Sequence, residues 1–246
     1  MPLNIAETSD DKKIKLENLK KKVNYSFLLL GITQLLAFNA LLNQFDFFIK
    51  KQPHYNPVFY TSIYSFFNLS GQIILLLFGS LISYKIQLIL FQVFALIGLI
   101  FLPLAPVLLN EDIGYFVCKI LSGFVGLSVA ISNSSLFGVV SYFGVDFLVS
   151  ISLGQGFSGI TSNILRTIVL VFLGDSDKDM NISVIIFFGI SALIILISLI
   201  STFFLYNNDY FNEVLIKAGV FKGEIKEELI DQEIELKNID EENMAA

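Results

Sequence analysis

Three glycines in the stretch SLGQGFSGITSNILRTIVLV, residues 152–171, follow the spacing Gly-x-Gly-x-x-Gly at Gly154, Gly156 and Gly159. In soluble proteins this spacing marks a turn that binds the pyrophosphate of a dinucleotide. That chemistry requires a strand, a tight turn and a helix within a βαβ unit. Here the motif lies inside a long apolar stretch flanked by others, where glycines more often allow close helix packing or a bend. We therefore expect no cofactor.

The first apolar stretch of the chain carries polar side chains on one helical face. Asn39, Asn43 and Asp46 follow one another at i, i+4 and i+7, a spacing that places them on the same side of a helix. Amides inside a membrane can bond neighbouring helices together, or they can face a substrate. The sequence leaves both interpretations of the two asparagines open.

The glycine-containing stretch carries a second polar face, which ends in the only arginine of the chain. This face consists of Gln155, Gly159, Ser162 and Arg166. An unpaired guanidinium inside a membrane is costly, and Asp46 lies near the same outer surface. We predict an ion pair between Asp46 and Arg166 that either holds the outer ends of the two helices together or acts as a gate. Alternatively, Arg166 extends its side chain to the membrane interface.

Small residues recur at every fourth position of another apolar stretch. They are Ser122, Gly126, Ala130, Ser134 and Gly138. Such a ridge lets two helix backbones approach closely, so we expect Gly126 and Gly138 to serve helix packing. Asn133 lies beside the ridge, and its amide offers two hydrogen-bond donors and an acceptor. The residues by themselves favour neither a structural nor a ligand-binding role for Asn133.

The composition is that of a membrane protein. Of 246 residues, 54% are hydrophobic and 15% are charged, against about 25% charged residues in soluble domains, and the mean hydropathy is +0.72. The net charge of −6 without a basic stripe argues against nucleic acid as a partner. One cysteine, Cys118, and one histidine, His54, exclude a disulfide framework and a cysteine-rich metal site.

We interpret His54, which lies in a short polar loop, as solvated surface. Because the sequence contains no recognisable pair of catalytic acids and no nucleophile–base set, we expect that the protein is not an enzyme and binds no metal.

Six apolar stretches are each long enough to cross a bilayer, which takes about 20 residues. They are residues 25–48, 58–84, 86–109, 113–143, 147–173 and 183–206. The fourth and fifth stretches are separated at Gly144 and Asp146, the best turn signals in a continuous apolar run. We therefore predict an all-α polytopic membrane protein. Its six-transmembrane-helix bundle spans 23–206, after a basic segment at 1–22 and before an acidic tail at 207–246.

Lysines orient this predicted bundle in the membrane. Six of them precede the first span: Lys12, Lys13, Lys15, Lys20, Lys21 and Lys22. Because positive charge accumulates on the cytoplasmic side, we place the N-terminus in the cytoplasm, and six spans return the C-terminus to the same side. Lys50 and Lys51 in the first outer loop weakly oppose this orientation. We interpret the acidic tail as a solvated linker, with a partner-binding helix as the alternative.

Four stretches resemble the N-terminal half of an equilibrative nucleoside transporter. LLAFN (35–39) with the downstream DFF (46–48) is similar to the family's first-span pattern, and LLLFGSLIS (75–83) to the end of its second span. ISNSSLFG (131–138) is similar to the fourth-span pattern, and GQGFSG (154–159) to the fifth-span pattern. The resemblance implies six of the eleven spans of a major-facilitator-like carrier that works by alternating access.

The resemblance also implies ligand-binding roles. Phe38 falls where the family has the tryptophan that lines the nucleoside site, and Leu42 falls at a second lining position one turn further on. Phe67 matches an apolar lining position of the second span. Asn133 matches the fourth-span glutamine that hydrogen-bonds the ligand. These groups suit an uncharged nucleoside, which needs a ring or apolar wall for its base and neutral amides for its edges.

The resemblance further places Gly154 and Gly159 at fifth-span glycines that serve transport and packing. The chain departs from the family at Ala37, where the family has a proline, and in lacking the family's second half, which supplies a charged pair facing the ligand. Alternating access requires two bundles. Either the coding sequence is truncated, or a second half-carrier chain pairs with this one, or the chain does not transport.

We therefore expect a carrier of nucleosides or nucleobases in the plasma membrane, equilibrative or proton-coupled. Its partners would be its ligand, the lipid bilayer and, where two chains pair, a second half-carrier. The alternative is a non-transporting multi-pass membrane subunit that assembles with a partner through its ridges of small residues. A different two-bundle carrier is disfavoured, because the broad facilitator superfamily usually has an Arg-rich loop between spans two and three, where this chain has Lys85.

Overall fold

The computed structural model describes residues 9–173 and 177–220, whose regular structure is helical, without a strand. The helices are α1 (Ser9–Leu42), α2 (Phe45–Lys51), α3 (Val58–Phe78), the 3-10 turn η1 (Gly79–Leu81), α4 (Tyr84–Phe101), α5 (Ala105–Leu108), α6 (Glu111–Val140), α7 (Val145–Leu173), α8 (Asp177–Tyr206) and α9 (Asp209–Lys217). The all-α fold expected from the sequence is confirmed over these residues. The start of the basic segment, 1–8, and the larger part of the expected tail, 221–246, lie outside the described residues.

Five segments of the described chain are long and apolar enough to cross a membrane. They are Lys13–Lys51, Val58–Leu81, Tyr84–Leu108, Glu111–Val140 and Asp179–Tyr206, and they match the first to fourth and the sixth predicted spans. The fifth predicted span corresponds to α7, which has 29 residues and carries the polar side chains of Gln155, Asn163 and Arg166. α7 is not among the five segments, so its crossing of the membrane stays a prediction.

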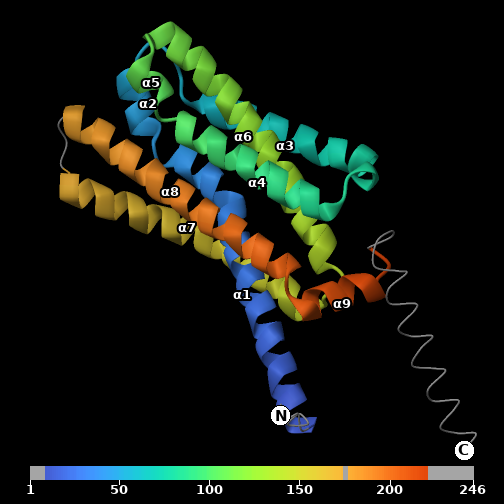
Figure 1. Ribbon diagram of the computed structural model, residues 1–246. Coiled ribbons are helices and arrows are strands. Elements are labelled where there is room, and N and C mark those ends of the chain that lie inside the picture. The colour runs from blue at the N-terminus through green and yellow to red at the C-terminus, as the bar shows by residue number, and fades with distance from the viewer. Residues whose placement is uncertain (1–8, 174–176, 221–246) are drawn as a thin grey trace, which may run out of the picture.

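The long helices form two closely packed pairs that are joined by two further helices. α1 packs along α7, and α3 packs along α6, while α4 contacts α6 and α8, and α8 contacts α1 and α7. Figure 1 shows this arrangement, with the short helices α2 and α5 at one end of the bundle and α9 near the other end. α4 and α8 bridge the two pairs on one side of the bundle. The other side is formed by α1, α3, α6 and α7.

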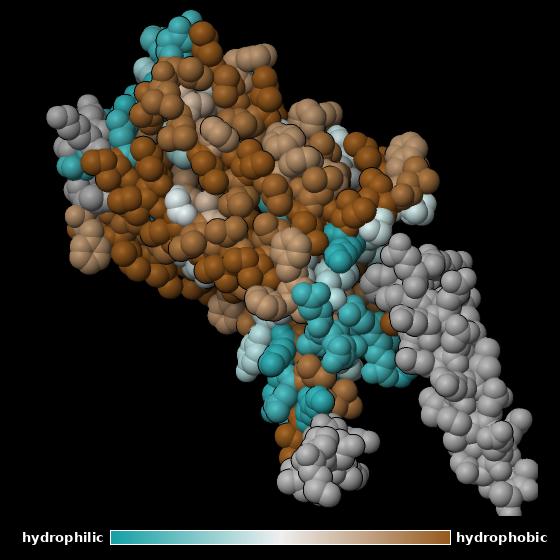
Figure 2. Space-filling view, in the orientation of Figure 1, coloured by the Kyte–Doolittle hydropathy of each residue, from teal (hydrophilic) through white to brown (hydrophobic). Residues whose placement is uncertain are grey.

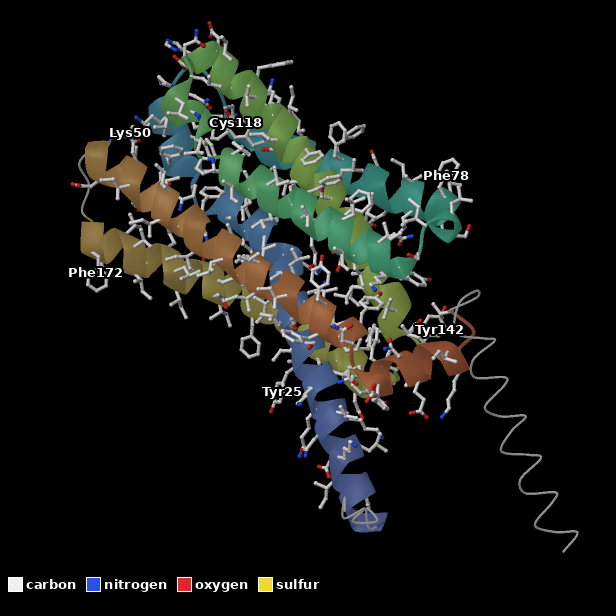
Figure 3. The ribbon with its side chains drawn as sticks, in the orientation of Figure 1. Tyr25, Lys50, Phe78, Cys118, Tyr142 and Phe172 are labelled. Carbon is white, nitrogen blue, oxygen red and sulfur yellow. The ribbon has the colours of Figure 1, made fainter. Side chains whose placement is uncertain are left out.

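The two partners of the α1–α7 pair run in the same direction. In Figure 3, Tyr25 and Tyr142 lie toward one end of the bundle, and Lys50 and Phe172 lie at the other. The turn that connects α6 to α7 contains Gly144 with a φ of +95°, a left-handed backbone conformation that glycine adopts without strain. This is the turn that the sequence predicts at Gly144.

The end of the bundle formed by α2 and α5 has an aromatic core. α1 ends at Leu42, and after a two-residue interruption α2 continues the chain and buries Phe47 and Phe48. The ring of Phe48 packs edge-on against Tyr60 at 4.9 Å between centroids, and Tyr60 lies 5.5 Å from Tyr115. The interruption therefore places Asp46 on a separate short helix that is anchored by buried aromatic residues.

The opposite end of the bundle is closed by α9. Asn208 caps this helix by accepting a hydrogen bond from the backbone N–H of Phe211 at 3.2 Å. Phe211 is buried in one hydrophobic cluster with Val23 and Phe27 of α1. The first part of the expected acidic tail thus packs on the bundle instead of forming a solvated linker, and the beginning of α1 and α9 lie at the same end.

The surface of the molecule separates into a wide hydrophobic zone and polar ends. Figure 2 shows hydrophobic residues over the bundle and hydrophilic residues on the first turns of α1 and at the opposite tip. The described part of the basic segment is helical, because α1 begins at Ser9, and its Lys21 pairs with Glu17 at 2.9 Å. A hydrophobic zone between polar ends is what a multi-pass membrane protein requires.

Candidate functional site

A series of polar contacts joins α1, and the residue that follows it, to α7 along the bundle. The contacts pair Asn24 with Ser150 (2.6 Å), Asn39 with Ser158 (3.2 Å) and Asn43 with Ser162 (2.8 Å). The amides of Asn39 and Asn43 donate to serine hydroxyls that are fully buried. Of the two interpretations that the sequence leaves open for these asparagines, the structure therefore displays helix-to-helix bonding.

The series ends in the ion pair between Asp46 and Arg166. Arg166 Nη2 lies 2.5 Å from Asp46 Oδ2, and Nη1 lies 3.4 Å from the hydroxyl of Ser183 on α8. The arginine side chain is 9% exposed and that of Asp46 is 61% exposed. The guanidinium is thus enclosed by protein and does not extend to the surface as the alternative interpretation required. The aspartate keeps contact with solvent at the α2–α5 end.

The Gly-x-Gly-x-x-Gly motif lies in the middle of α7, so no strand–turn–helix unit exists to hold a dinucleotide. A Cβ atom added to Gly154 would lie 2.2 Å from the carbonyl oxygen of Leu28, and one added to Gly31 would lie 2.3 Å from that of Ile151. These two glycines allow the backbones of α1 and α7 to touch. In contrast, a Cβ atom added to Gly156 would have no neighbour within 4 Å.

Gly159 requires a correction to the packing role expected from the sequence. A Cβ atom at this position would meet only the amide nitrogen of Asn39, at 4.0 Å, so no backbone approaches it closely. The reason is the direction of the packed face of α7. That face follows Gly154, Ser158, Ser162 and Arg166 at intervals of four, and Gly159 lies to one side of it.

The ridge of small residues on α6 packs against α3 and α4. A Cβ atom at Gly126 would lie 2.3 Å from the carbonyl oxygen of Tyr64 on α3, so this glycine allows direct backbone contact. At Gly138 the added atom would lie 2.8 Å from the ring of Tyr84 on α4. Both glycines lie at close contacts between helices, Gly126 against a helix backbone and Gly138 against an aromatic side chain.

Asn133 on α6 forms a pair with Gln155 on α7. The Nε2 atom of Gln155 donates to Oδ1 of Asn133 at 3.0 Å. Both side chains are half-buried. Within the described residues, the side chain of Asn133 makes no other hydrogen bond. The bond to Gln155 connects the two helix pairs, α3–α6 and α1–α7, across the side of the bundle that α4 and α8 leave uncovered.

The other three expected ligand-lining residues lie on α1 and α3. The ring of Phe38 is half-buried and packs against Tyr64 with centroids 5.2 Å apart. Leu42 and Phe67 are each 41% exposed, and Phe67 lies over Gly123 of α6, where an added Cβ would be 2.8 Å from its ring. None of these three residues forms a hydrogen bond with Asn133. All four residues lie on the helices of the side that α4 and α8 leave uncovered, and we call this side the open face.

A separate cleft of about 830 Å³ lies at the α9 end of the bundle. Residues of α3, α4, α6 and α8 line it, among them Gln72, Lys85, Ser134 and Tyr206. None of the four expected ligand-lining residues contributes to this cleft. We place the candidate site on the open face because its helices carry these four residues and the bonded amides of Asn133 and Gln155.

A comparison with protein families now decides the class of the molecule. A model of the nucleoside transporter family matches residues 119–245, slightly more than half of the chain. The chain belongs to the nucleoside transporter family. The match includes the stretches 131–138 and 154–159, which support the resemblance drawn from the sequence, whereas 35–48 and 75–83 precede it. No curated protein matches the chain.

Membership of the nucleoside transporter family makes the protein a multi-pass membrane protein, in agreement with its apolar helices. It also assigns nucleoside transport as the general function and nucleosides as the class of substrate. The family consists of carriers, whose work is movement of a substrate without covalent chemistry. Among the described residues, no group of three or more His, Cys, Asp and Glu side chains is placed to hold a metal ion.

The roles of two residues of the candidate site could not be assigned from the sequence. Tyr64 supplies the ring against which Phe38 packs, and nothing in the order of residues shows which aromatic residue of α3 meets it. Ser158 receives the amide of Asn39, and here a signal exists, because Ser158 lies four residues from both Gly154 and Ser162. A spacing of four along α7 identifies the packed face better than the mixed spacing through Gln155 and Gly159.

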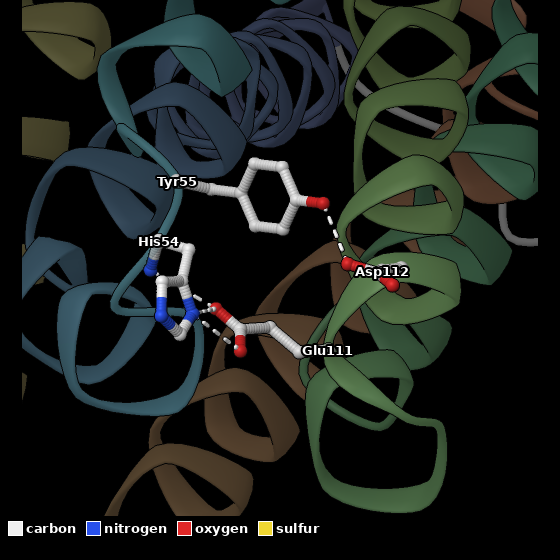
Figure 4. A network of polar contacts seen from close by, with 4 residues as sticks. All are labelled: His54, Tyr55, Glu111 and Asp112. Atoms are coloured by element: carbon white, nitrogen blue, oxygen red, sulfur yellow. Dashed lines mark hydrogen bonds and ion pairs between the residues drawn. The ribbon is translucent and has the colours of Figure 1, made fainter.

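At the α2–α5 end, the loop before α3 is tied to the beginning of α6 (Figure 4). The backbone N–H of His54 donates to Glu111 at 3.0 Å, and the imidazole Nδ1 lies 3.0 and 3.1 Å from the two carboxylate oxygens. Tyr55 donates its hydroxyl to Asp112 at 2.6 Å. The imidazole is mostly exposed. His54 is therefore surface, as expected, but it is also bonded to the first residue of α6.

The carboxylate of Glu111 determines the protonation of this histidine. Its hydrogen bond to the imidazole, and secondarily its negative charge, raise the pKa of His54 above the usual value. The histidine is thus held in its charged form to a higher pH than a free side chain would be.

Proposed function

We propose that this chain carries nucleosides or nucleobases by alternating access, equilibrative or proton-coupled, and that the open face is half of the substrate path. The proposal rests on the ring of Phe38 on α1 and on the bonded amides of Asn133 and Gln155, which belong to the helices of the open face. A nucleoside is uncharged, so its base can pack on an aromatic ring while neutral amides bond its edges. No fixed counter-charge is required for such a ligand.

The open face requires a second bundle to complete the path. Leu42 and Phe67 are large apolar residues, each 41% exposed, on helices that also carry polar groups. A surface that mixes both kinds of residue is suited to a water-filled path between two bundles and poorly suited to lipid. We propose that a second half-carrier, supplied by another chain or by a longer form of the same protein, covers this face.

The pair of Asp46 and Arg166 is proposed to act at the extracellular end of the path. Asp46 lies on α2, directly after the interruption of α1, so movement of α2 relative to α7 would separate the two charges. Because the arginine is nearly buried and the aspartate is largely exposed, opening of this end would admit water to the guanidinium. The pair would therefore stabilise the closed form of the extracellular end.

The proposed orientation is supported by the lysines and by the packing of α9. The beginning of α1 and α9 lie at the same end of the bundle, and Lys20 places its ammonium 5.4 Å from the ring of Tyr210. Because basic residues collect on the cytoplasmic side, we propose that this end is cytoplasmic, together with both termini. The plasma membrane is the proposed location.

Uptake of labelled uridine and adenosine by a host that lacks nucleoside uptake tests this proposal. The chain is expressed alone, and also together with the C-terminal half of a family carrier. We expect no uptake by the chain alone and saturable uptake when the second half is present. An absence of uptake in both conditions, with the protein in the membrane, would contradict carrier function and favour a non-transporting membrane subunit.

A further inference from the structure

We infer that Gln155 determines specificity, because it and Asn133 together read an edge of the base that bears an N–H donor beside an acceptor. This inference rests on the proposed function and adds the recognition chemistry to it. Its basis is the amide–amide bond of 3.0 Å between α7 and α6. None of the ligand-binding roles described above belongs to Gln155.

The bond between the two amides leaves complementary groups unused. Gln155 donates through Nε2, and Asn133 accepts through Oδ1. An amide side chain offers two N–H donors and an acceptor oxygen, so the Nδ2 group of Asn133 and the Oε1 atom of Gln155 remain available. Within the described residues, neither side chain makes another hydrogen bond. The pair therefore presents one donor group and one acceptor.

Two other glutamine contacts between helices are different in kind. Gln34 donates to Ser132 at 3.3 Å, and Gln92 accepts from Thr202 at 3.2 Å. Both glutamines are almost fully buried, at 3% and 4% exposure, and they lie in the interior between α1, α4, α6 and α8. Gln155 is half-buried, so its spare oxygen can meet a ligand, whereas the spare groups of the interior glutamines cannot.

No neighbouring backbone approaches α7 closely one turn beyond Gln155. The next glycine on the same side of α7 is Gly159, whose nearest neighbour for an added Cβ is the Asn39 amide at 4.0 Å. Asn39 adjoins Phe38, the ring proposed to pack on the base. The backbone of α1 therefore does not close over α7 at Gly159, one turn from Gln155.

The spare groups match the edges of common bases. Asparagine and glutamine recognise adenine by accepting from its amino group and donating to a ring nitrogen, and the bases of single strands are recognised in the same manner along their edges. Here Oε1 of Gln155 would accept from the N–H of the base, and Nδ2 of Asn133 would donate to the neighbouring acceptor. Such a pair should discriminate against bases whose N–H is replaced by a methyl group.

Competition by matched analogues tests the inference in cells that express the chain with the second half. Uridine is compared with 3-methyluridine, and adenosine with N6,N6-dimethyladenosine, as inhibitors of labelled uptake. We expect the methylated analogues to inhibit roughly ten- to a hundred-fold more weakly in the wild type, the range given by one well-placed pair of hydrogen bonds. In Gln155→Leu the ratio should fall to about twofold or less.

Three further variants make the outcome decisive. Gln155→Met has a similar size and no hydrogen-bonding group, so it should also lose discrimination if Gln155→Leu does not reach the membrane. Gln155→Glu keeps an acceptor oxygen but loses the N–H that bonds Asn133, so its discrimination should fall below the wild type and stay above that of Gln155→Leu. Gln34→Leu removes a buried interhelical amide away from the open face, so it should lower the amount of protein or the rate but leave the ratio unchanged.

The results separate the inference from the function on which it rests. Uptake by the wild type together with an unchanged ratio in Gln155→Leu or Gln155→Met would overturn the inference alone. A wild type that discriminates less than twofold between each base and its methylated analogue would do the same. No uptake by the wild type would overturn the proposed function and the inference together.

Discussion

Replacement of Gly154 by alanine should separate α1 from α7, whereas the same change at Gly156 should not. The Cβ atom of an alanine at 154 would lie 2.2 Å from the carbonyl oxygen of Leu28 and 3.0 Å from the Cα of Gly31. These are backbone atoms, so no rotation of a side chain can relieve the overlap. An ordinary contact begins at 3.4 Å, which requires the helices to move apart by about 1 Å.

The size of the effect follows from what this movement breaks. Overpacking of a well-packed contact destabilises by about 1–3 kcal/mol. A shift of about 1 Å would also lengthen the bonds of Asn39 to Ser158 and Asn43 to Ser162 beyond hydrogen-bonding distance, and interhelical bonds in membranes average about 0.6 kcal/mol each. We therefore expect a loss of about 2–4 kcal/mol, or roughly 5–15 °C in Tm for a chain of this size.

The assay is thermal denaturation of the purified protein in detergent, with the folded fraction measured by size-exclusion chromatography. Gly156→Ala is the matched control, because it lies two residues away in the same motif and has no neighbour within 4 Å. Its Tm should stay the same or rise slightly, since alanine favours a helix over glycine by up to about 1 kcal/mol. A Gly154→Ala protein as stable as Gly156→Ala would refute the assignment of Gly154 to backbone packing.

Three further predictions follow from the charged and aromatic contacts. Asp46→Arg and Arg166→Asp should each lower thermal stability by about 1–3 kcal/mol, less than for a fully buried pair because Asp46 is exposed, and the double exchange should restore part of the loss; a double exchange no better than either single change would exclude the pair. His54 has a raised pKa, so its bond to Glu111 is fully present below pH 6.5 and is lost as the pH rises through the higher folded-state pKa. Tm measured between pH 6 and 9 should therefore fall more steeply in the wild type than in His54→Gln, and equal slopes would count against the bond. Phe38→Ala should raise the KM for nucleosides about tenfold at unchanged protein level, because stacking of a base on a ring is worth about 1–3 kcal/mol; an unchanged KM would remove Phe38 from the site.

The long helices and the charged pair could be predicted from the sequence because each depends on a local pattern. Apolar length defines the spans, and helical spacing places Asp46 and Arg166 on faces that can meet. These patterns are properties of one helix at a time. The interruption after Leu42, which moves Asp46 onto a separate short helix, leaves no comparable signal.

The contacts between helices could not be predicted in the same way, because they depend on how the side chains of two helices are aligned with each other. Gly154 and Gly159 look equivalent in the motif, yet only Gly154 meets the backbone of α1. The partner of Phe38 proved to be Tyr64, one of several aromatic residues on α3. The packing of Phe211 on α1 was likewise hidden, because the composition changes to polar after residue 206.

Protection of introduced cysteines by nucleoside tests most directly whether the open face binds substrate. Cys118 is the only cysteine and is buried, so a Cys118→Ser background allows single sites to be labelled with a small polar thiol reagent. Asn133→Cys and Phe38→Cys report on the face, and Tyr142→Cys in the turn between α6 and α7 is the control. With the second half present, saturating uridine or adenosine should slow labelling at 38 and 133 severalfold and leave 142 unchanged. Labelling at 38 and 133 that is unaffected by any nucleoside, in a preparation that transports, would contradict the account.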